Sequence, residues 1–330
     1  MKRNTLLITL LLIATPSAWA QSTEPPHGGR HLGRPALVFL VAGQSNAVGC
    51  GVLSPEIHAA DGLAQKRPLV PGSTAIESGL PIAAAAYTHS YIWVPSIKAF
   101  QAVDPQSNLR PPEQNKRGHG MELPVLRELE KRFPENDIFV IKHAHGGSNL
   151  YRHWKPENQS EKNGFYSKWL ESYREGIASL KKDYPEVRVI GLYWDQGESD
   201  GDKAAKEYEA NLTHFISVLR RDTGIPQLPF FIRKHIFRWP NIDTIIAAQL
   251  KIASRDPRCH IIDIDLGTLD KNYEAWAYSR GNPHVSSKGF VELTKRLFDG
   301  PLRDATIESF DKVETQPKNA NASSPEANKK

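Results

Sequence analysis

Four short polar segments carry the residues of this chain whose types could do chemistry. They are the serine segment, Gly-Gln-Ser-Asn at 43–46; the glycine segment, His-Ala-His-Gly-Gly-Ser-Asn at 143–149; the glutamine segment, Trp-Asp-Gln-Gly-Glu-Ser-Asp-Gly at 194–201; and the histidine segment, Asn-Pro-His at 282–284. A serine hydroxyl is a weak nucleophile until a histidine accepts its proton. Ser45 as nucleophile and His284 as general base would together suit acyl transfer. The alternative for Ser45 is a structural role as the cap of a following helix.

An oxyanion formed in such a reaction needs N–H donors. The sequence offers the backbone N–H of Ser45, a backbone N–H of the Gly146-Gly147 pair and the side-chain amide of Gln196. One donor of this kind typically contributes about 10²-fold to 10³-fold in rate. Glycine suits the second position because a backbone without a Cβ can approach a substrate closely.

The elements that must position these segments can be predicted from hydrophobic patterning. Residues 38–42 are an apolar run rich in β-branched and aromatic side chains, which is typical of a strand buried on both faces of a parallel sheet. Further strands are expected at 138–141, 187–194, 230–233 and 260–264, and helices at 124–133, 169–180, 208–219, 242–252 and 286–298. This alternation predicts a three-layer α/β fold with about five parallel strands in one domain. The polar segments then meet at the carboxyl edge of the sheet, where such folds bind ligands.

The ends of the chain and one internal stretch differ from this pattern. Residues 1–20 have basic residues, a short apolar run and Ala-Trp-Ala at 18–20, which predicts a signal peptide cleaved near Ala20 and an exported protein, periplasmic or secreted. The folded domain is expected at 35–300. Residues 51–118 are irregular and rich in Pro, Gly and Ser, so we expect a long, lid-like insertion near the first turn. Residues 314–330 are too polar to bury a core and are predicted to be a disordered tail.

Charge, the length of the apolar run and the two cysteines bear on which partners and which disulfide the protein could have. The formal net charge is +5, and basic residues are interspersed with acidic ones, which argues against a nucleic-acid partner. The apolar run in the signal peptide is shorter than the ~18 residues that a membrane-spanning helix needs, so no membrane partner is expected after cleavage. The two cysteines, Cys50 and Cys259, are expected at opposite edges of the sheet and therefore not in a disulfide.

The four segments together resemble the sialate O-acetylesterase family, which includes the acetyl xylan esterases of carbohydrate esterase family six and belongs to the SGNH hydrolases. The similarity extends over 35–298, and Trp-x-Gln-Gly-Glu-x-Asp is its most specific element. It implies a flavodoxin-like sheet and hydrolysis of acetyl esters on sugars without a metal or cofactor. By position, Ser45 and His284 would be catalytic, and Ser45, Gly147 and Gln196 would form the oxyanion hole. Neither the sequence nor the resemblance indicates whether the sugar is a sialic acid, a xylan or another polymer, and the oligomeric state is also left open.

One position departs from the family pattern. Many SGNH enzymes have an aspartate three residues before the histidine, where it orients the imidazole. Here that residue is Gly281, so either a backbone carbonyl holds His284 or another carboxylate reaches it, with Asp263 and Asp265 as candidates. A third possibility is that a protein with glycine at this position has lost its catalytic activity.

Other polar residues in the segments have structural interpretations. We expect Asn46, Glu198 and Asp200 to bond neighbouring loops rather than to react. His143 and His145 have the His-x-His spacing of metal ligands, but no spaced carboxylates complete a site, so no metal is predicted. Two alternative functions remain: a carbohydrate-binding protein without catalysis, and a metal-dependent hydrolase that uses these two histidines.

Overall fold

The structure is a computed structural model that describes residues 31–110, 117–158, 160, 162–237, 239–264, 276–279 and 282–314. Its strands are β1 (Ala36–Gly43), β2 (Ser90–Val94), β3 (Ala99–Ala102), β4 (Ile138–Ala144), β5 (Val187–Asp195), β6 (Phe230–Arg233), β7 (Cys259–Ile262) and β8 (Asp311–Lys312). Within these residues they form one sheet of eight strands in the order β3-β2-β4-β1-β5-β6-β7, with β8 paired to β5.

The five strands predicted from the sequence are consecutive in this sheet, from β4 to the edge strand β7. β4, β1, β5, β6 and β7 are parallel neighbours. Numbered among themselves in chain order, they run 2-1-3-4-5, which is the flavodoxin-like order. The predicted three-layer α/β fold is therefore confirmed. In this order the chain changes direction across the sheet beside β1, and the crevice at that point lies outside the carboxyl ends of the strands.

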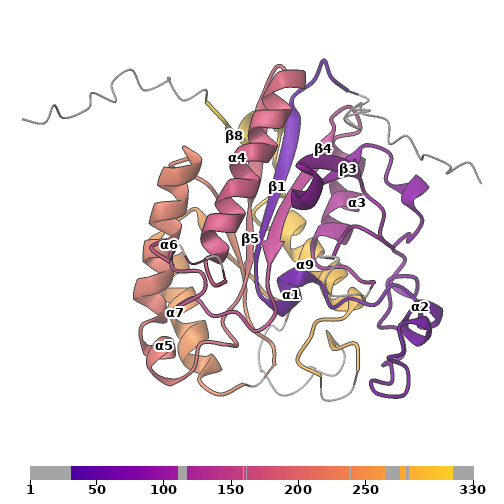
Figure 1. The fold of residues 1–330 in the computed structure, drawn as a ribbon, viewed down its shortest axis with the longest axis vertical. Helices are drawn as coiled ribbons and strands as arrows, with labels where there is room; N and C mark the ends of the chain where they lie inside the picture. The colour runs from indigo at the N-terminus through magenta and orange to yellow at the C-terminus, as the bar shows by residue number, and fades with distance from the viewer. Residues whose placement is uncertain are drawn as a thin grey trace, which may run out of the picture.

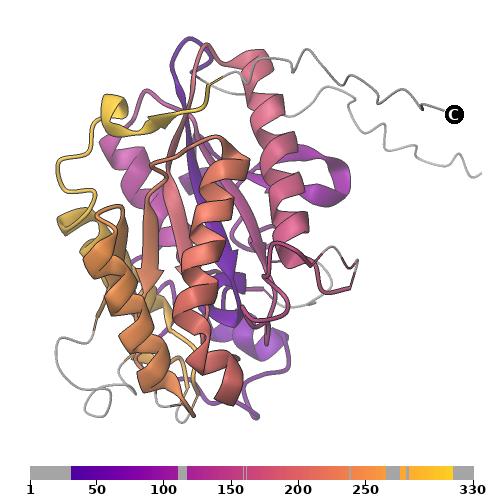
Figure 2. The ribbon, with the colours of Figure 1, turned by 90° about the vertical axis from the view of Figure 1, so that its left-hand side faces the viewer.

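Helices cover both faces of the sheet. They are α1 (Ser45–Val48), α2 (Pro55–Ala60), α3 (Glu122–Arg132), α4 (Phe165–Asp183), α5 (Asp202–Lys206), α6 (Tyr208–Thr223), α7 (Ile242–Arg255) and α9 (Ser287–Asp299), with short 3₁₀ turns at Ala84–Ala86, Pro95–Ile97 and Ile307–Ser309. Figure 1 shows α4 in front of the sheet and α9 behind it, and Figure 2 shows α4, α6 and α7 side by side over one face. Among the described residues, no helix is long and apolar enough to cross a lipid bilayer.

The side chains of β1 contribute to two hydrophobic cores, one on each face of the sheet. Its alternate residues Val38 and Leu40 pack with α4, α6 and α7, while Leu37 and Phe39 pack with α3 and α9. Every residue from Ala36 to Ala42 is fully buried. Burying one such aliphatic or aromatic side chain contributes roughly 1.5–3 kcal/mol, so β1 is a rigid base for the serine segment that follows it.

Residues 51–118 contribute more to the sheet than the sequence indicated. β2 pairs parallel with β4, and β3 returns antiparallel to β2 through the 3₁₀ turn at Pro95–Ile97, so this hairpin forms one edge of the sheet. Residues 51–89 contain α2 and irregular loops. The predicted signal peptide and all of the predicted tail after Glu314 lie outside the described residues.

The two cysteines are free thiols at opposite ends of the strands, as predicted. Cys50 follows α1 at the carboxyl edge, whereas Cys259 is the first residue of β7.

Candidate active site

Just before Ser45, the backbones at the ends of the neighbouring strands β1 and β5 approach each other closely. Gly43 has φ +141°, and a Cβ built there would lie 2.1 Å from the carbonyl oxygen of Asp195, so only glycine fits. The backbone N–H of Gln44 donates to that same carbonyl at 2.8 Å. Ser45 then begins α1 at the carboxyl end of β1, the lower end of that strand in Figure 1. The residue that caps α1 is Gln44, which leaves Ser45 without the capping role that the sequence allowed.

Gln44 connects the serine segment to the glutamine segment. Its side-chain Oε1 accepts hydrogen bonds from the backbone N–H of Gly197 at 3.3 Å and of Ser199 at 3.4 Å, and from the Gln196 amide at 3.3 Å. Because Gln44 is buried, these bonds are shielded from water and hold the two segments in one arrangement.

Asn46 connects the serine segment to the histidine segment. Its Oδ1 accepts from the backbone N–H of Val285 at 2.9 Å, and its Nδ2 donates to Glu198 Oε1 at 3.3 Å. The side chain is fully buried. The residue after the proposed nucleophile is thus bonded to the residue after the proposed base, which brings Ser45 and His284 to the same rim.

The imidazole of His284 is oriented by its own segment. Its Nδ1 lies 2.8 Å from Asn282 Oδ1, which also accepts from the backbone N–H of His284 at 3.0 Å. An amide oxygen can only accept, so Nδ1 carries the proton and Nε2 is left as an acceptor, as a general base requires. The Tyr278 ring stacks on the imidazole, with centroids 6.5 Å apart and planes 13° apart.

In the described structure the side chain bonded to His284 Nδ1 is Asn282, and an orienting role for Asp263 or Asp265 stays a prediction. Asp263 forms an ion pair with Lys234 at 2.6 Å, and Asp265 and Gly281 lie outside the described residues. The bond from the backbone of His284 to the side chain of Asn282, two residues earlier, is an Asx turn, and Asn-Pro is a sequence signal for such turns. That signal could have identified Asn282 from the sequence.

His284 is half-buried and has a perturbed pKa. Burial lowers the pKa of its imidazole from the usual value to about 4, since an apolar environment disfavours the charged form. The carboxylate of Glu198 opposes this shift, and the positive charges of Arg67, Arg233 and Arg110 add to it. The imidazole is consequently neutral at pH 7.

The glycine segment lies beside Ser45. The backbone N–H of His145 donates to the Gly43 carbonyl at 3.1 Å, and a Cβ built on Gly146 would lie 3.9 Å from the Cβ of Ser45. Gly147 follows with φ +71° and is exposed. The segment thus approaches the serine closely, and the assignment of Gly147 as an oxyanion donor stays a prediction.

The side-chain amide of Gln196, a predicted oxyanion donor, already has hydrogen-bond acceptors within the protein. Its buried amide nitrogen lies 2.5 Å from Asp200 Oδ2, 3.2 Å from the Ser148 carbonyl and 3.3 Å from Gln44 Oε1, so its two hydrogens already have three acceptors. Asp200 also accepts from the backbone N–H groups of Leu150 and Tyr151. Both side chains therefore bond the glutamine segment to the chain around the glycine segment, the role expected for Asp200. The predicted oxyanion role of Gln196 stays a prediction.

A buried charge network lies beneath the glutamine segment. Arg233 bonds Asp195 and Glu198, both at 2.7 Å, and His235 lies 3.1 Å from Glu198. Burial opposes the charge of Glu198, but His235 and Arg233 outweigh it and hold the pKa of that carboxyl below its usual range. Glu198 is thus an anion that is held in place and, through Asn46, joined to the serine segment.

The histidines of the glycine segment pack against aromatic rings. His145 stacks on Phe165 with centroids 4.5 Å apart, and His143 packs against Phe165 and Trp154. Burial lowers the pKa of His143 to about 4. Across the described ranges, no three His, Cys, Asp or Glu side chains gather as metal ligands would.

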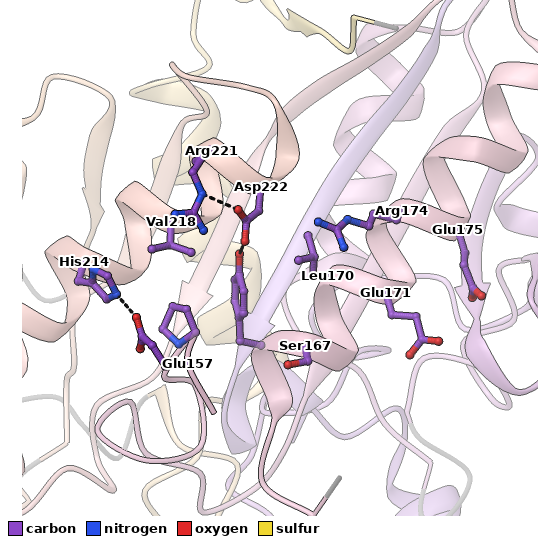
Figure 3. Close-up of a pocket in the computed structure, with 12 residues that line it drawn as sticks. Glu157, Ser167, Leu170, Glu171, Arg174, Glu175, His214, Val218, Arg221 and Asp222 are labelled. Atoms are coloured by element: carbon purple, nitrogen blue, oxygen red, sulfur yellow. Dashed lines mark hydrogen bonds and ion pairs between the residues drawn. The ribbon is translucent and has the colours of Figure 1, made fainter. Parts of the chain in front are cut away.

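A surface hollow of about 750 Å³ lies elsewhere, between α4 and α6. Figure 3 shows that Ser167 and His214 line it from different helices and do not face each other. The Ser167 hydroxyl donates to a backbone carbonyl, and His214 pairs with Glu157. This hollow lacks the arrangement found around Ser45.

Comparison with known proteins shows the family of the chain and supports its fold. The model of the family described as "Carbohydrate esterase, sialic acid-specific acetylesterase" matches residues 35–302. Among solved structures, a protein of Arabidopsis thaliana is similar with 19% identity and a TM-score of 0.56, covering 82% of this chain and 99% of its own. NanS is similar with 17% identity and a TM-score of 0.53, covering 82% and 98%. At these identities the two structures support the fold. A search of curated proteins finds no match. The chain belongs to the sialic acid-specific acetylesterase family of carbohydrate esterases and is a carboxylic ester hydrolase.

Proposed function

We propose that this esterase removes O-acetyl groups from a carbohydrate through an acetyl-enzyme intermediate on Ser45. The observation that carries the proposal is the Asn46 side chain, which bonds the backbone beside His284 while its own backbone continues from Ser45. The neutral imidazole, with Nδ1 held by Asn282, supports a base at Nε2.

The reaction would proceed in two steps. In the first, the Ser45 hydroxyl attacks the acetyl carbonyl as His284 Nε2 takes its proton, and the oxyanion accepts hydrogen bonds from the Ser45 N–H and a backbone N–H of the glycine segment. The ester bond to the sugar breaks, and His284 returns the proton to the sugar oxygen. In the second step, water attacks acetyl-Ser45 with His284 again as base, and acetate leaves.

Hydrolysis of p-nitrophenyl acetate tests this mechanism. We expect activity from the wild type, loss to background in Ser45→Ala and His284→Ala, and an acetyl adduct on Ser45 by mass spectrometry at short times. Ser167→Ala and His214→Ala, from the hollow between α4 and α6, are matched controls that should retain activity. The assay is repeated on acetylated sugars. A wild type no more active than Ser45→Ala on every ester would leave a carbohydrate-binding protein, and sensitivity to EDTA would favour a metal-dependent hydrolase.

We also propose that the protein is exported after cleavage near Ala20, on the strength of the amino-terminal composition. Amino-terminal sequencing of the protein recovered outside the cytoplasm tests this. An amino terminus that retains residues 1–20 would overturn it.

A further inference from the structure

A second serine–histidine pair lies inside the protein, apart from Ser45 and His284. The side chains of His119 and Ser287 are fully buried, and the imidazole Nε2 lies 2.8 Å from the Ser287 hydroxyl oxygen. Because both are fully buried, an ester in solution does not reach this pair. Its place in the chain suggests a different role, since Ser287 is the first residue of α9 and follows His284 by three positions.

The backbone of His119 is bonded to the chain that leaves α1. The His119 N–H donates to the Gly51 carbonyl at 3.1 Å, and the His119 carbonyl accepts from the Gly51 N–H at 2.9 Å, so the two residues form an antiparallel bridge. A Cβ built on Gly51 would lie 2.7 Å from His119 Nε2, so any side chain there would displace the imidazole. Glycine at 51 thus lets the chain after α1 pass directly against the ring.

The neighbours of the imidazole determine its protonation. Nδ1 lies 2.8 Å from the Gly120 carbonyl, which can only accept, so Nδ1 carries the proton. Burial lowers the pKa of His119 to about 4, so the ring is neutral at pH 7 and Nε2 accepts. The Ser287 hydroxyl is then the donor to Nε2, and it also lies 2.9 Å from the Val52 carbonyl. The Phe290 ring, one turn further along α9, packs against the imidazole with centroids 5.7 Å apart.

We propose that His119 is a positioning residue that fixes the start of α9, and with it His284, relative to Ser45. The bond from Asn46 to Val285 ties the histidine segment to α1. The bond between His119 and Ser287 ties the first turn of α9 to the chain that follows α1, so both contacts set the place of His284 with respect to the serine segment. The proposal rests on the Ser45–His284 mechanism above and adds to it a residue from outside the four polar segments.

Two substitutions of His119 separate its two side-chain contacts. An asparagine amide can take the place of Nδ1 and a glutamine amide that of Nε2, so His119→Asn retains the Gly120 bond and His119→Gln retains the Ser287 bond. Each variant loses one buried hydrogen bond, and both should therefore unfold at lower urea concentrations than the wild type.

The activities of the two variants should differ. A misplacement of about 1 Å at the reacting groups costs on the order of 10² in rate, so in His119→Asn we expect kcat for p-nitrophenyl acetate to fall about 10-fold to 100-fold. KM should change little, because His284 is the base in both steps and the two steps slow together. His119→Gln should keep most of the wild-type kcat.

Ser287→Ala removes the same bond from the other side and leaves His119 in place. Added to His119→Gln, it should lower kcat to that of His119→Asn; added to His119→Asn, it should lower kcat no further, because the bond is already lost. Thr223→Val is the matched control, since the Thr223 hydroxyl is buried and donates to the Leu219 carbonyl at 2.8 Å at the end of α6. It should lower stability in urea and leave kcat unchanged.

The outcomes distinguish this inference from the mechanism. A folded His119→Asn or Ser287→Ala with wild-type kcat, beside inactive Ser45→Ala and His284→Ala, would overturn the role of His119 and leave the mechanism intact. Equal losses of kcat in His119→Asn and His119→Gln would also overturn it, because activity would then follow stability rather than the Ser287 bond. If His119→Asn does not fold, Ser287→Ala decides the question. Wild-type activity in Ser45→Ala or His284→Ala would overturn the mechanism, and the positioning role with it.

Discussion

Replacing Asn46 by alanine should separate the serine segment from the histidine segment without changing either reacting side chain. The Asn46 side chain is fully buried, accepts from the Val285 N–H at 2.9 Å and donates to Glu198 at 3.3 Å. Alanine removes both bonds and leaves α1 in place, since an alanine is favourable in a helix. The residue next to His284, Val285, then loses its hydrogen bond to α1.

The size of the effect follows from which groups lose their partner. The Val285 N–H is buried and becomes unpaired, which costs about 1–3 kcal/mol of stability. Glu198 retains Arg233 and His235, so its carboxylate adds little to this cost. For activity, a misplacement of about 1 Å at the reacting groups can cost on the order of 10² in rate. We therefore expect kcat/KM to fall about 100-fold, mostly through kcat.

The assay pairs urea denaturation with p-nitrophenyl acetate kinetics, so that lost folding and lost positioning are separated. Asn46→Asp is the informative comparison, because it keeps an acceptor for Val285 but places a second carboxylate against Glu198. A protonated aspartate can accept from Val285 and donate to Glu198 as asparagine does, whereas an ionised one repels the Glu198 anion, so Asn46→Asp should exceed Asn46→Ala in activity only where the aspartate is protonated. An Asn46→Ala protein with wild-type kcat/KM would refute the reasoning that this bond positions His284.

Two further predictions concern buried charge. Lys142 donates to the Val48 and Leu109 carbonyls and to Glu122, all within 2.8 Å, so Lys142→Met should destabilise the protein by about 3–5 kcal/mol by leaving a buried carboxylate unpaired. Urea denaturation measures this, and Glu122→Gln added to it should recover part of the loss; unchanged stability would contradict it. Because burial lowers the pKa of His284 to about 4, the base stays neutral as pH falls below 6.5, and the acidic limb of kcat/KM should lie well below that pH. A pH profile, with folding followed by circular dichroism, tests this; a limb at an ordinary histidine pKa would contradict it.

The sequence was sufficient for the parts of the fold that have regular hydrophobic patterning. The run at 38–42 and the four later apolar runs predicted the five parallel strands from β4 to β7, because buried parallel strands are nearly continuous in apolar residues. The hairpin of β2 and β3 was missed because it is short and lies at an edge. The pairing of β8 with β5 joins residues more than a hundred positions apart, and no local pattern indicates it.

Part of the candidate site could also be predicted from the sequence. Convergence of the four polar segments follows from parallel strands alone, so the neighbourhood of Ser45 and His284 could be predicted. The anchoring of Arg67 to Tyr278 depends on a loop with an irregular path, and no hydrophobic periodicity predicts where such a loop lies. Asn282 is an intermediate case, because its turn is a local sequence signal, whereas its hydrogen bond to His284 Nδ1 is seen only in the structure.

The contacts of the glutamine segment explain how it supports the rim of the site. Gln196 and Asp200 bond the chain around the glycine segment, and Glu198 bonds the serine segment through Asn46. Each of these polar side chains is largely buried, where leaving one unpaired is costly, so each tolerates few substitutes. These bonds fix the geometry of the rim. A related chain could keep it intact after losing its nucleophile, and the presence of Ser45 and His284, rather than of the motif, is what argues for catalysis in this protein.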